Sequence, residues 1–119
     1  DIRNKKGLEQ AFAEHGPQAV IHFAALAYVG ESVSDPGAYY STNVAGTLTL
    51  LEAARADGVD KMIFSSSCAT YGVPANLPIQ EREIQQPINP YGRTKLIAEH
   101  MLADYSAAYR GYDEDYEED

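Results

Sequence analysis

Basic side chains are scarce in this 119-residue sequence, which has 9 Lys and Arg against 18 Asp and Glu and a formal net charge of −9. This balance argues against general nucleic-acid binding, because such binding depends on neutralising phosphates with cations. Part of the excess is local, since residues 113–119 hold six acidic side chains and no basic one. We therefore expect residues 111–119 to form an acidic, disordered tail outside the fold.

Cysteine and long apolar runs are equally scarce. Cys68 is the single cysteine, so the chain cannot form an internal disulfide, which fits a reducing compartment. The longest nearly apolar run, residues 19–30, is shorter than the roughly 18 residues that a membrane-spanning helix needs. No basic-then-apolar signal peptide opens the sequence. These absences predict a cytoplasmic protein without a membrane partner.

Metal-ligand spacing and a phosphate-binding turn are also missing. His22 is interpreted as a hydrogen-bonded strand histidine, and His15 and His100 are separate helical histidines without a cysteine or carboxylate at metal-ligand spacing, so no metal site is expected. There is no G-x-G-x-x-G, the turn whose glycines and following helix bind a dinucleotide pyrophosphate. The sequence begins at Asp1 without a methionine, and two strands alone bury two sheet faces poorly. We expect the chain to be an internal piece of a larger domain.

The hydrophobic content, 45%, is enough for a core, and its spacing predicts alternating helices and strands. A short amphipathic helix is expected over residues 8–16, where Gly-Pro ends it. Residues 19–25 and 61–66 are predicted strands. The first is continuously apolar, which is typical of a strand buried on both faces in a parallel sheet. Residues 26–34 are expected to form a loop.

Two longer helices are indicated by their capping residues. Asp35 and Pro36 make a good helix start, and Gly58 makes a good end. The apolar stripe at helical spacing between them consists of Tyr40, Val44, Leu48 and Leu51. After a proline-rich irregular stretch, a final helix is predicted over residues 89–108. The order α-β-α-β-α predicts an α/β, Rossmann-like fold, part of a doubly wound parallel sheet, over residues 1–110.

Tyr91 and Lys95 are the first candidates for chemistry. Their spacing of four residues places both on one face of the final helix. A fixed cation beside a tyrosine favours the phenolate and can bring the phenol pKa toward neutral pH, which makes a base. Ser65, Ser66 and Ser67 follow the second strand with hydroxyls that could meet this pair. The residues predict a Ser/Tyr/Lys proton-transfer site, with a surface pair on an amphipathic helix as the alternative.

Five ordered blocks of sequence strengthen the first reading. They are FAA at residues 23–25, GES at 30–32, NVxGT at 43–47, FSSSCATYG at 64–72 and NPYGRTK at 89–95. A Y-x-x-x-K pair alone is common, but five blocks in this order are specific. Over residues 1–109 the chain resembles the extended short-chain dehydrogenase/reductase family, and most closely its UDP-glucose 4-epimerases.

The resemblance implies an NAD-dependent enzyme that interconverts UDP-glucose and UDP-galactose by transient oxidation at sugar C4. Tyr91 would act as the base, Lys95 would favour its phenolate, and Ser67 would hydrogen-bond the sugar 4-oxygen. The residues that the resemblance places at NAD are Asp1, Ile2, Phe23, Ala24, Ala25, Asn43, Ser65, Ser66, Tyr91 and Lys95. It also implies a UDP-sugar substrate and a homodimer.

Two other readings stay open. The first is a nucleotide-sugar 4,6-dehydratase or another extended short-chain dehydrogenase of the same fold. The dehydratases, however, carry acidic residues directly after the hydroxyl that corresponds to Ser67, where this chain has Cys68 and Ala69. The other reading is a non-catalytic piece that associates through its helices or sheet edges. The chain also has Ala27 where the epimerases usually place a lysine that reaches the cofactor. We expect the chain by itself to be inactive, because catalysis needs cofactor and substrate held within reach of the base.

Overall fold

The computed structural model describes residues 1–109, and its centre is a two-stranded parallel sheet. The strands β1 (Val20–His22) and β2 (Met62–Phe64) pair in register, with Ile21 opposite Ile63. The parallel α/β arrangement predicted from the sequence is confirmed. The acidic tail predicted for residues 111–119 lies outside the described residues.

Helix α1 (Lys5–His15) has the predicted amphipathic character and explicit caps at both ends. The Asn4 side chain accepts a hydrogen bond from the Gly7 amide at 3.0 Å, which satisfies one free amide of the first turn. Gly16 ends the helix in the left-handed region, with φ 52°, and its amide donates to the Phe12 carbonyl. The predicted end of this helix is confirmed.

The segment after β1 is more helical than its small residues suggested. Helix α2 (Val29–Ser34) occupies most of the stretch predicted to be a loop, so that prediction is wrong. Backbone hydrogen bonds close the turns of α2, from the Ser32 amide to the Tyr28 carbonyl at 3.0 Å and from the Asp35 amide to the Glu31 carbonyl at 2.8 Å. Asp35 then caps α3 (Pro36–Tyr39) by accepting from the Ala38 amide, as its position before proline predicted.

A π-helical segment, Tyr40–Ala45, joins α3 to helix α4 (Gly46–Ala56). The buried positions along this helical stretch are three or four residues apart, as in an uninterrupted helix, and they lie one residue before the predicted stripe: Tyr39, Asn43, Thr47 and Leu50. Tyr40 and Leu48, predicted for the buried stripe, are 39% and 44% exposed. Tyr39 is buried in place of Tyr40, so part of the predicted core stripe is wrong.

The second half of the chain follows the sequence prediction closely. A 3-10 helix, Cys68–Tyr71, succeeds β2, and an irregular stretch leads to α5 (Pro90–Tyr109). The Asn89 side chain caps α5 by accepting from the Gly92 amide at 2.8 Å. The predicted start of the final helix is therefore confirmed.

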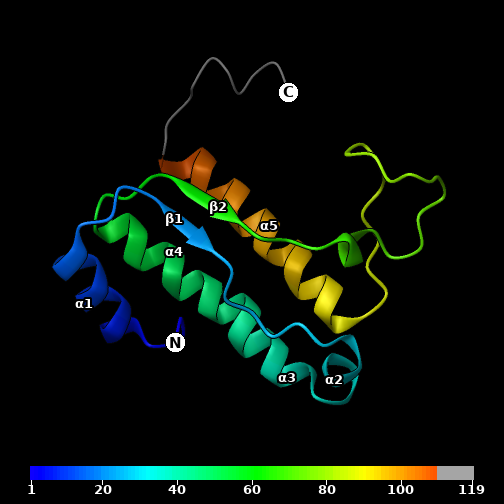
Figure 1. The fold of residues 1–119 in the computed structure, drawn as a ribbon, viewed down its shortest axis with the longest axis horizontal. Coiled ribbons are helices and arrows are strands. Elements are labelled where there is room, and N and C mark those ends of the chain that lie inside the picture. The colour runs from blue at the N-terminus through cyan, green and yellow to red at the C-terminus, as the bar shows by residue number, and fades with distance from the viewer. Residues whose placement is uncertain (110–119) are drawn as a thin grey trace.

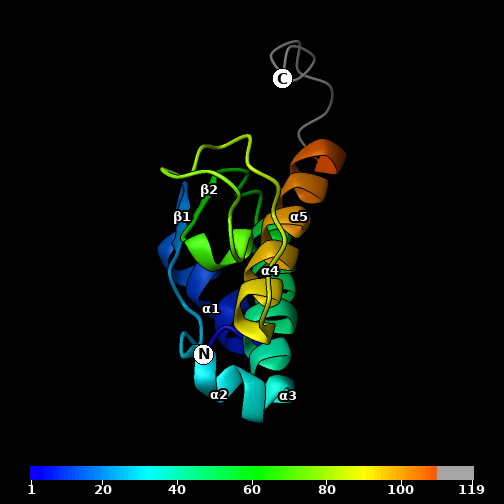
Figure 2. The same cartoon turned by 90° about the vertical axis from the view of Figure 1, so that its right-hand side faces the viewer.

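Helices α4 and α5 lie on one side of the sheet, and α1 packs against α4 (Figures 1 and 2). The main core consists of the buried Phe12, Leu50, Ala53 and Ala54 with the partly buried Leu8, Val20, Val59 and Met62. Alternate strand residues point to opposite faces of a sheet, so one residue of each strand faces away from this core.

The uncovered face corrects the prediction that the strands are buried on both sides. Ile21 is 57% exposed, Ile63 is 65% exposed and Phe23 is 72% exposed. Strand β1 is also shorter than predicted and ends at His22, and the Leu26 backbone beyond it bonds to the Asn43 side chain. Across residues 1–109, no helix combines the length and apolar character needed to cross a membrane.

Candidate functional site

Lys95 ties α5 to the end of β2. Its side chain is buried, its Nζ donates to the Ser65 carbonyl at 2.8 Å, and it lies 4.9 Å from the centre of the Phe64 ring. Burial lowers the pKa of Lys95, because an ammonium loses hydration there. The ammonium is thus directed to residues 65–67, which the sequence predicts as part of the site. These three residues are hereafter called the serine loop.

His22 lies on the same buried face of the sheet, next to Phe64 with ring centres 5.4 Å apart. Its Nε2 lies 2.9 Å from the Thr47 hydroxyl. Burial first, and then the charge of Lys95, lower the pKa of His22. Within residues 1–109, no group of three or more His, Cys, Asp or Glu could hold a metal ion. His22 is a hydrogen-bonded core histidine in this structure.

Tyr91, half-buried, lies one helical turn before Lys95 at the start of α5. Its amide donates to the Ser32 hydroxyl at 3.1 Å, and its ring meets the Tyr39 ring edge-on at 6.4 Å. The neighbouring Gly92 lies so close to the 3-10 helix that an added Cβ would stand 2.6 Å from the Ala69 carbonyl oxygen. Only glycine permits this approach of α5 to the segment after the serine loop.

The serine loop is held by a local hydrogen bond and by a hydrogen bond to α5. The Ser67 hydroxyl accepts from the Ala69 amide at 3.1 Å and caps the 3-10 helix. The Ser66 hydroxyl donates to Glu99 at 2.5 Å, one turn beyond Lys95 on α5. Among the described residues, no hydrogen bond joins the Tyr91 hydroxyl, the Lys95 ammonium and the Ser67 hydroxyl. The structure brings their backbone elements together and leaves their direct contact a prediction.

Apart from Asn43, Tyr91 and Lys95, the residues predicted at NAD fall into three places. Phe23 and Ala24 are exposed and Ala25 is half-buried, and all three follow the carboxyl end of β1. Ser65 and Ser66 belong to the serine loop. Asp1 pairs with Arg3 at 2.8 Å, and Ile2 packs against Gly46. Their contact with a cofactor stays a prediction.

Asn43 is buried, and its amide makes three hydrogen bonds. Its Oδ1 accepts from the Leu26 amide at 2.9 Å, and its Nδ2 donates to the Leu26 carbonyl and to the Thr94 hydroxyl. The Thr94 hydroxyl in turn donates to the Tyr91 carbonyl at 2.8 Å. Asn43 therefore links the loop after β1 to the first turn of α5.

Three residues of this network were missed from the sequence: Ser32, Thr94 and Glu99. Glu99 had a readable signal, since it stands four residues after Lys95 and so shares its helix face. Ser32 lies in the GES block but had no role of its own, and Thr94 lies between Tyr91 and Lys95. Their partners are 51 and 59 residues distant for Thr94 and Ser32, which no local pattern reveals.

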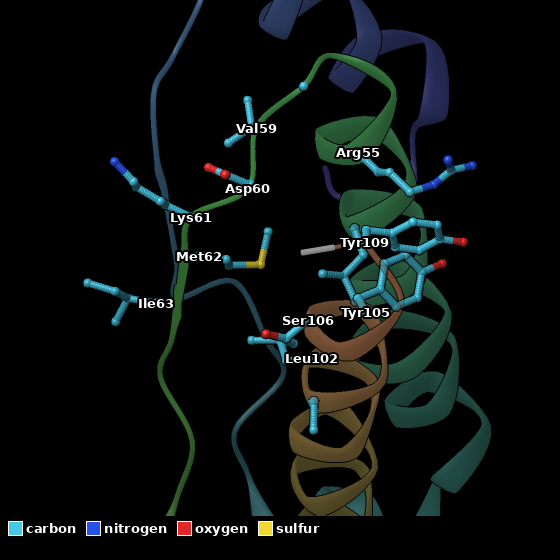
Figure 3. Close-up of a pocket in the computed structure, with 13 residues that line it drawn as sticks. Arg55, Val59, Asp60, Lys61, Met62, Ile63, Leu102, Tyr105, Ser106 and Tyr109 are labelled. Atoms are coloured by element: carbon cyan, nitrogen blue, oxygen red, sulfur yellow. The ribbon is translucent and has the colours of Figure 1, made fainter. Parts of the chain in front are cut away.

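A separate cavity of about 730 Å³ lies at the other end of α5, beside α4 and the start of β2 (Figure 3). Met62 points from β2 toward Tyr105 and Tyr109 of α5, whereas Lys61 points the other way. The Arg55 guanidinium lies 4.5 Å from the centre of the Tyr109 ring. None of the predicted site residues lines this cavity.

Comparison with known proteins gives a family match over most of the chain. Residues 1–112 match the family model described as GDP-mannose 4,6 dehydratase. The chain is 56% identical over 111 residues to a UDP-glucose 4-epimerase of Rhizobium meliloti (strain 1021), covering 93% of this chain and 34% of that protein.

Solved structures agree. UDP-glucose 4-epimerase from Brucella ovis in complex with NAD superposes with a TM-score of 0.90 at 63% identity, covering 92% of this chain and 34% of that chain. The Bifidobacterium longum enzyme with NAD+ and UDP gives a TM-score of 0.89 at 44% identity, covering 92% and 33%. The chain spans about a third of the length of these relatives. The predicted resemblance is confirmed: the chain belongs to the GDP-mannose 4,6 dehydratase family, and its similar relatives include UDP-glucose 4-epimerases.

Proposed function

We propose that the protein carrying this chain is an NAD-dependent UDP-glucose 4-epimerase, which interconverts UDP-glucose and UDP-galactose in galactose metabolism. The observation that carries the proposal is the position of Lys95. Its buried ammonium is directed to the serine loop, one helical turn from Tyr91. The Lys95 ammonium and the contacts between α5 and the 3-10 helix after the serine loop support the proposal that Tyr91, Lys95 and Ser67 act together.

The proton chemistry follows from these groups. Tyr91, as phenolate, would take the proton of the sugar 4-hydroxyl while C4 becomes a ketone, and would return it once the ketone presents its other face. A positive charge near the phenolate stabilises that anion, which is the role we assign to Lys95. Ser67 accepts one bond from the Ala69 amide and keeps its own proton to donate to the 4-oxygen.

The residues after β1 fit a cofactor of this kind. In doubly wound sheets ligands bind outside the carboxyl ends of the strands, where residues 23–25 lie. Phe23 is 72% exposed and Ala24 is small and exposed, so an open, partly apolar surface stands there. When bound, NAD supplies the acceptor and donor of the C4 hydride. Asn43 would hold this surface in place through Leu26.

A nucleotide-sugar 4,6-dehydratase is the second candidate, because the matched family model bears that kind of name. Elimination of water needs an acid and a base beside the sugar. The two residues after Ser67 are Cys68 and Ala69, so the acidic group expected there is missing. We therefore rank epimerisation first.

The test is a chimera in which residues 1–109 replace the matching segment of the Brucella ovis enzyme, to which they are 63% identical. We expect the chimera to convert UDP-galactose to UDP-glucose with NAD bound. Release of a 4-keto-6-deoxy sugar would favour the dehydratase, and an inactive but folded chimera would contradict both proposals.

The 119-residue chain alone is expected to bind NAD weakly and to leave UDP-galactose unchanged, because its sequence has no glycine-rich phosphate turn. Isothermal titration calorimetry checks this expectation. A dissociation constant of about 1 μM, near −8 kcal/mol, would contradict it.

We also propose that the parent protein is a cytoplasmic homodimer. The exposed Tyr40 and Leu48 lie on the continuous helix from α3 to α4 and offer apolar surface for a partner helix. Light scattering of the parent protein checks the dimer, and Leu48→Asp should shift it toward monomer. A monomer at micromolar concentration would contradict the proposal.

A further inference from the structure

We propose that Ser32 is a positioning residue for Tyr91, which it holds in place from a different helix. This inference deepens the proposed function and rests on it, since Tyr91 is the base of that reaction. Ser32 belongs to α2, 59 residues before Tyr91 in sequence, and is fully buried.

The start of α5 shows why an outside acceptor matters. The first amides of a helix have no partner within it. Pro90 has no amide hydrogen, Gly92 donates to the Asn89 side chain, and Arg93 donates to the Asn89 carbonyl. The Tyr91 amide of this turn instead donates to a different helix, to the Ser32 hydroxyl of α2 at 3.1 Å. Ser32 therefore fixes the turn that carries the phenol.

The orientation of the Ser32 hydroxyl is set as well. It donates its proton to the Val29 carbonyl at 2.6 Å, so its lone pairs are free to accept from Tyr91. The Ser32 hydroxyl therefore has a single orientation in which it donates to Val29 and accepts from Tyr91. An alanine in its place would remove the acceptor and leave the Tyr91 amide without a partner.

A second contact from the same corner acts on the Tyr91 ring. The Tyr39 ring, fully buried, meets it edge-on at 89°. The Tyr39 hydroxyl accepts from the Tyr28 amide at 2.8 Å and donates to Glu31 at 3.1 Å, so this ring is itself fixed. The Tyr91 backbone is therefore held by a hydrogen bond to α2, and its ring is held by a contact with α3. These contacts matter because a displacement of about 1 Å from the reacting geometry can lower the rate roughly 100-fold.

The first test uses the full 119-residue chain and needs no activity. With 15N-tyrosine labelling, hydrogen exchange at the Tyr91 amide should be slow in the unmodified chain and about tenfold faster in Ser32→Ala, which corresponds to the loss of one hydrogen bond. Ser34→Ala is the matched control, because the Ser34 hydroxyl bonds only to carbonyls of its own helix. Equal exchange in both variants would overturn the proposal.

The second test measures the role in the chimera described above. Ser32→Ala should lower kcat about tenfold or more and change KM less than about twofold, whereas Ser34→Ala should change neither. Ser32→Cys keeps the shape but accepts a hydrogen bond weakly, so its kcat should lie between the two.

The outcomes separate this inference from the function it rests on. If Tyr91→Phe inactivates the chimera while Ser32→Ala matches Ser34→Ala, the positioning role is wrong and the base role stands. If Tyr91→Phe retains near-normal turnover, the proposed function fails, and the exchange test still decides the hydrogen bond. If Ser32→Ala lowers kcat, raises KM and also lowers the midpoint of unfolding, Ser32 contributes to the stability of the fold and does not specifically position Tyr91.

Discussion

The two halves of α5 differ in the kind of contact that holds them. The first half buries Gly92, Thr94, Lys95 and Ala98, and its polar groups bond to residues of α2, the π-helical segment and the serine loop. The second half lines the cavity beside α4 with half-buried or exposed side chains. Residues 90–99 of α5 are hereafter the bonded half, and residues 100–109 are the loose half.

The difference follows from what each half has to position. Hydrogen bonds act over a narrow range of distance and angle, so a set of them fixes side chains at defined places. Aromatic and cation contacts, such as Arg55 with Tyr109 at 4.5 Å, tolerate more displacement. The bonded half carries the proposed chemistry, and the loose half mainly completes the packing.

The largest expected effect comes from removing one hydroxyl in the bonded half. In the chimera, Tyr91→Phe should lower kcat by roughly 100-fold or more, because it removes the proposed base. Tyr105→Phe makes the same chemical change in the loose half and should leave kcat unchanged. Steady-state kinetics checks both variants. If their kcat values are similar, the proposed difference between the two halves of α5 is wrong.

The next largest effect concerns the stability of the chain. Thr94→Val should lower the free energy of unfolding by about 1–3 kcal/mol, because it leaves the buried Asn43 amide without one acceptor. Urea unfolding measures it. The control is Thr49→Val on α4, whose hydroxyl bonds to the Ala45 carbonyl of the preceding turn. If Thr94→Val lowers the free energy of unfolding no more than this control does, the hydrogen bond between Asn43 and Thr94 does not contribute the predicted stability.

A pH-dependent effect follows from burial of Lys95. Burial lowers its pKa below 10.5, so between the two values the unfolded chain binds a proton that the folded chain releases. Stability from this group is therefore gained as pH rises toward 10.5 and lost as pH falls. Burial raises the pKa values of Tyr39 and Tyr105, so these two groups lose stability as pH rises, both in the unmodified chain and in Lys95→Met. Urea unfolding at about pH 8 and about pH 10 should therefore show a more favourable change in stability with pH in the unmodified chain than in Lys95→Met.

The exposed Lys61 at the start of β2 provides the control for that measurement. Lys61→Met should show the same change in stability between the two pH values as the unmodified chain. The explanation by burial of Lys95 is wrong if Lys61→Met departs from the unmodified chain or if Lys95→Met matches it.

The smallest effect is expected in the loose half. Arg55→Ala removes the contacts with the Tyr109 ring and with Glu52, both at the protein surface. Exposed pairs of this kind contribute little, so the urea midpoint should stay within experimental error of the unmodified chain. A clear fall would show that the loose half is held as firmly as the other.

Much of the fold was predictable because its signals are local. Asp35, Asn89 and Gly16 cap helices through residues at most four positions away, and each cap lies where the sequence placed it. The errors arose where a signal was not local. The buried face lies at Tyr39 and not at Tyr40 because the packing of neighbouring elements decides which side of the helix is covered, and the exposure of Ile21 depends on which sheet face the helices cover.

For the site, the sequence alone predicted the chemical groups: Tyr91, Lys95 and the serine loop were proposed from residue type, helical spacing and the five sequence blocks. Only the tertiary structure decided how they are held. Ser32 reaches Tyr91 across 59 residues, Asn43 reaches Thr94 across 51, and Lys95 reaches the Ser65 carbonyl across 30. Spacing within one helix is set by its 3.6-residue turn, whereas contacts between helices and strands are set by the packing of the whole chain.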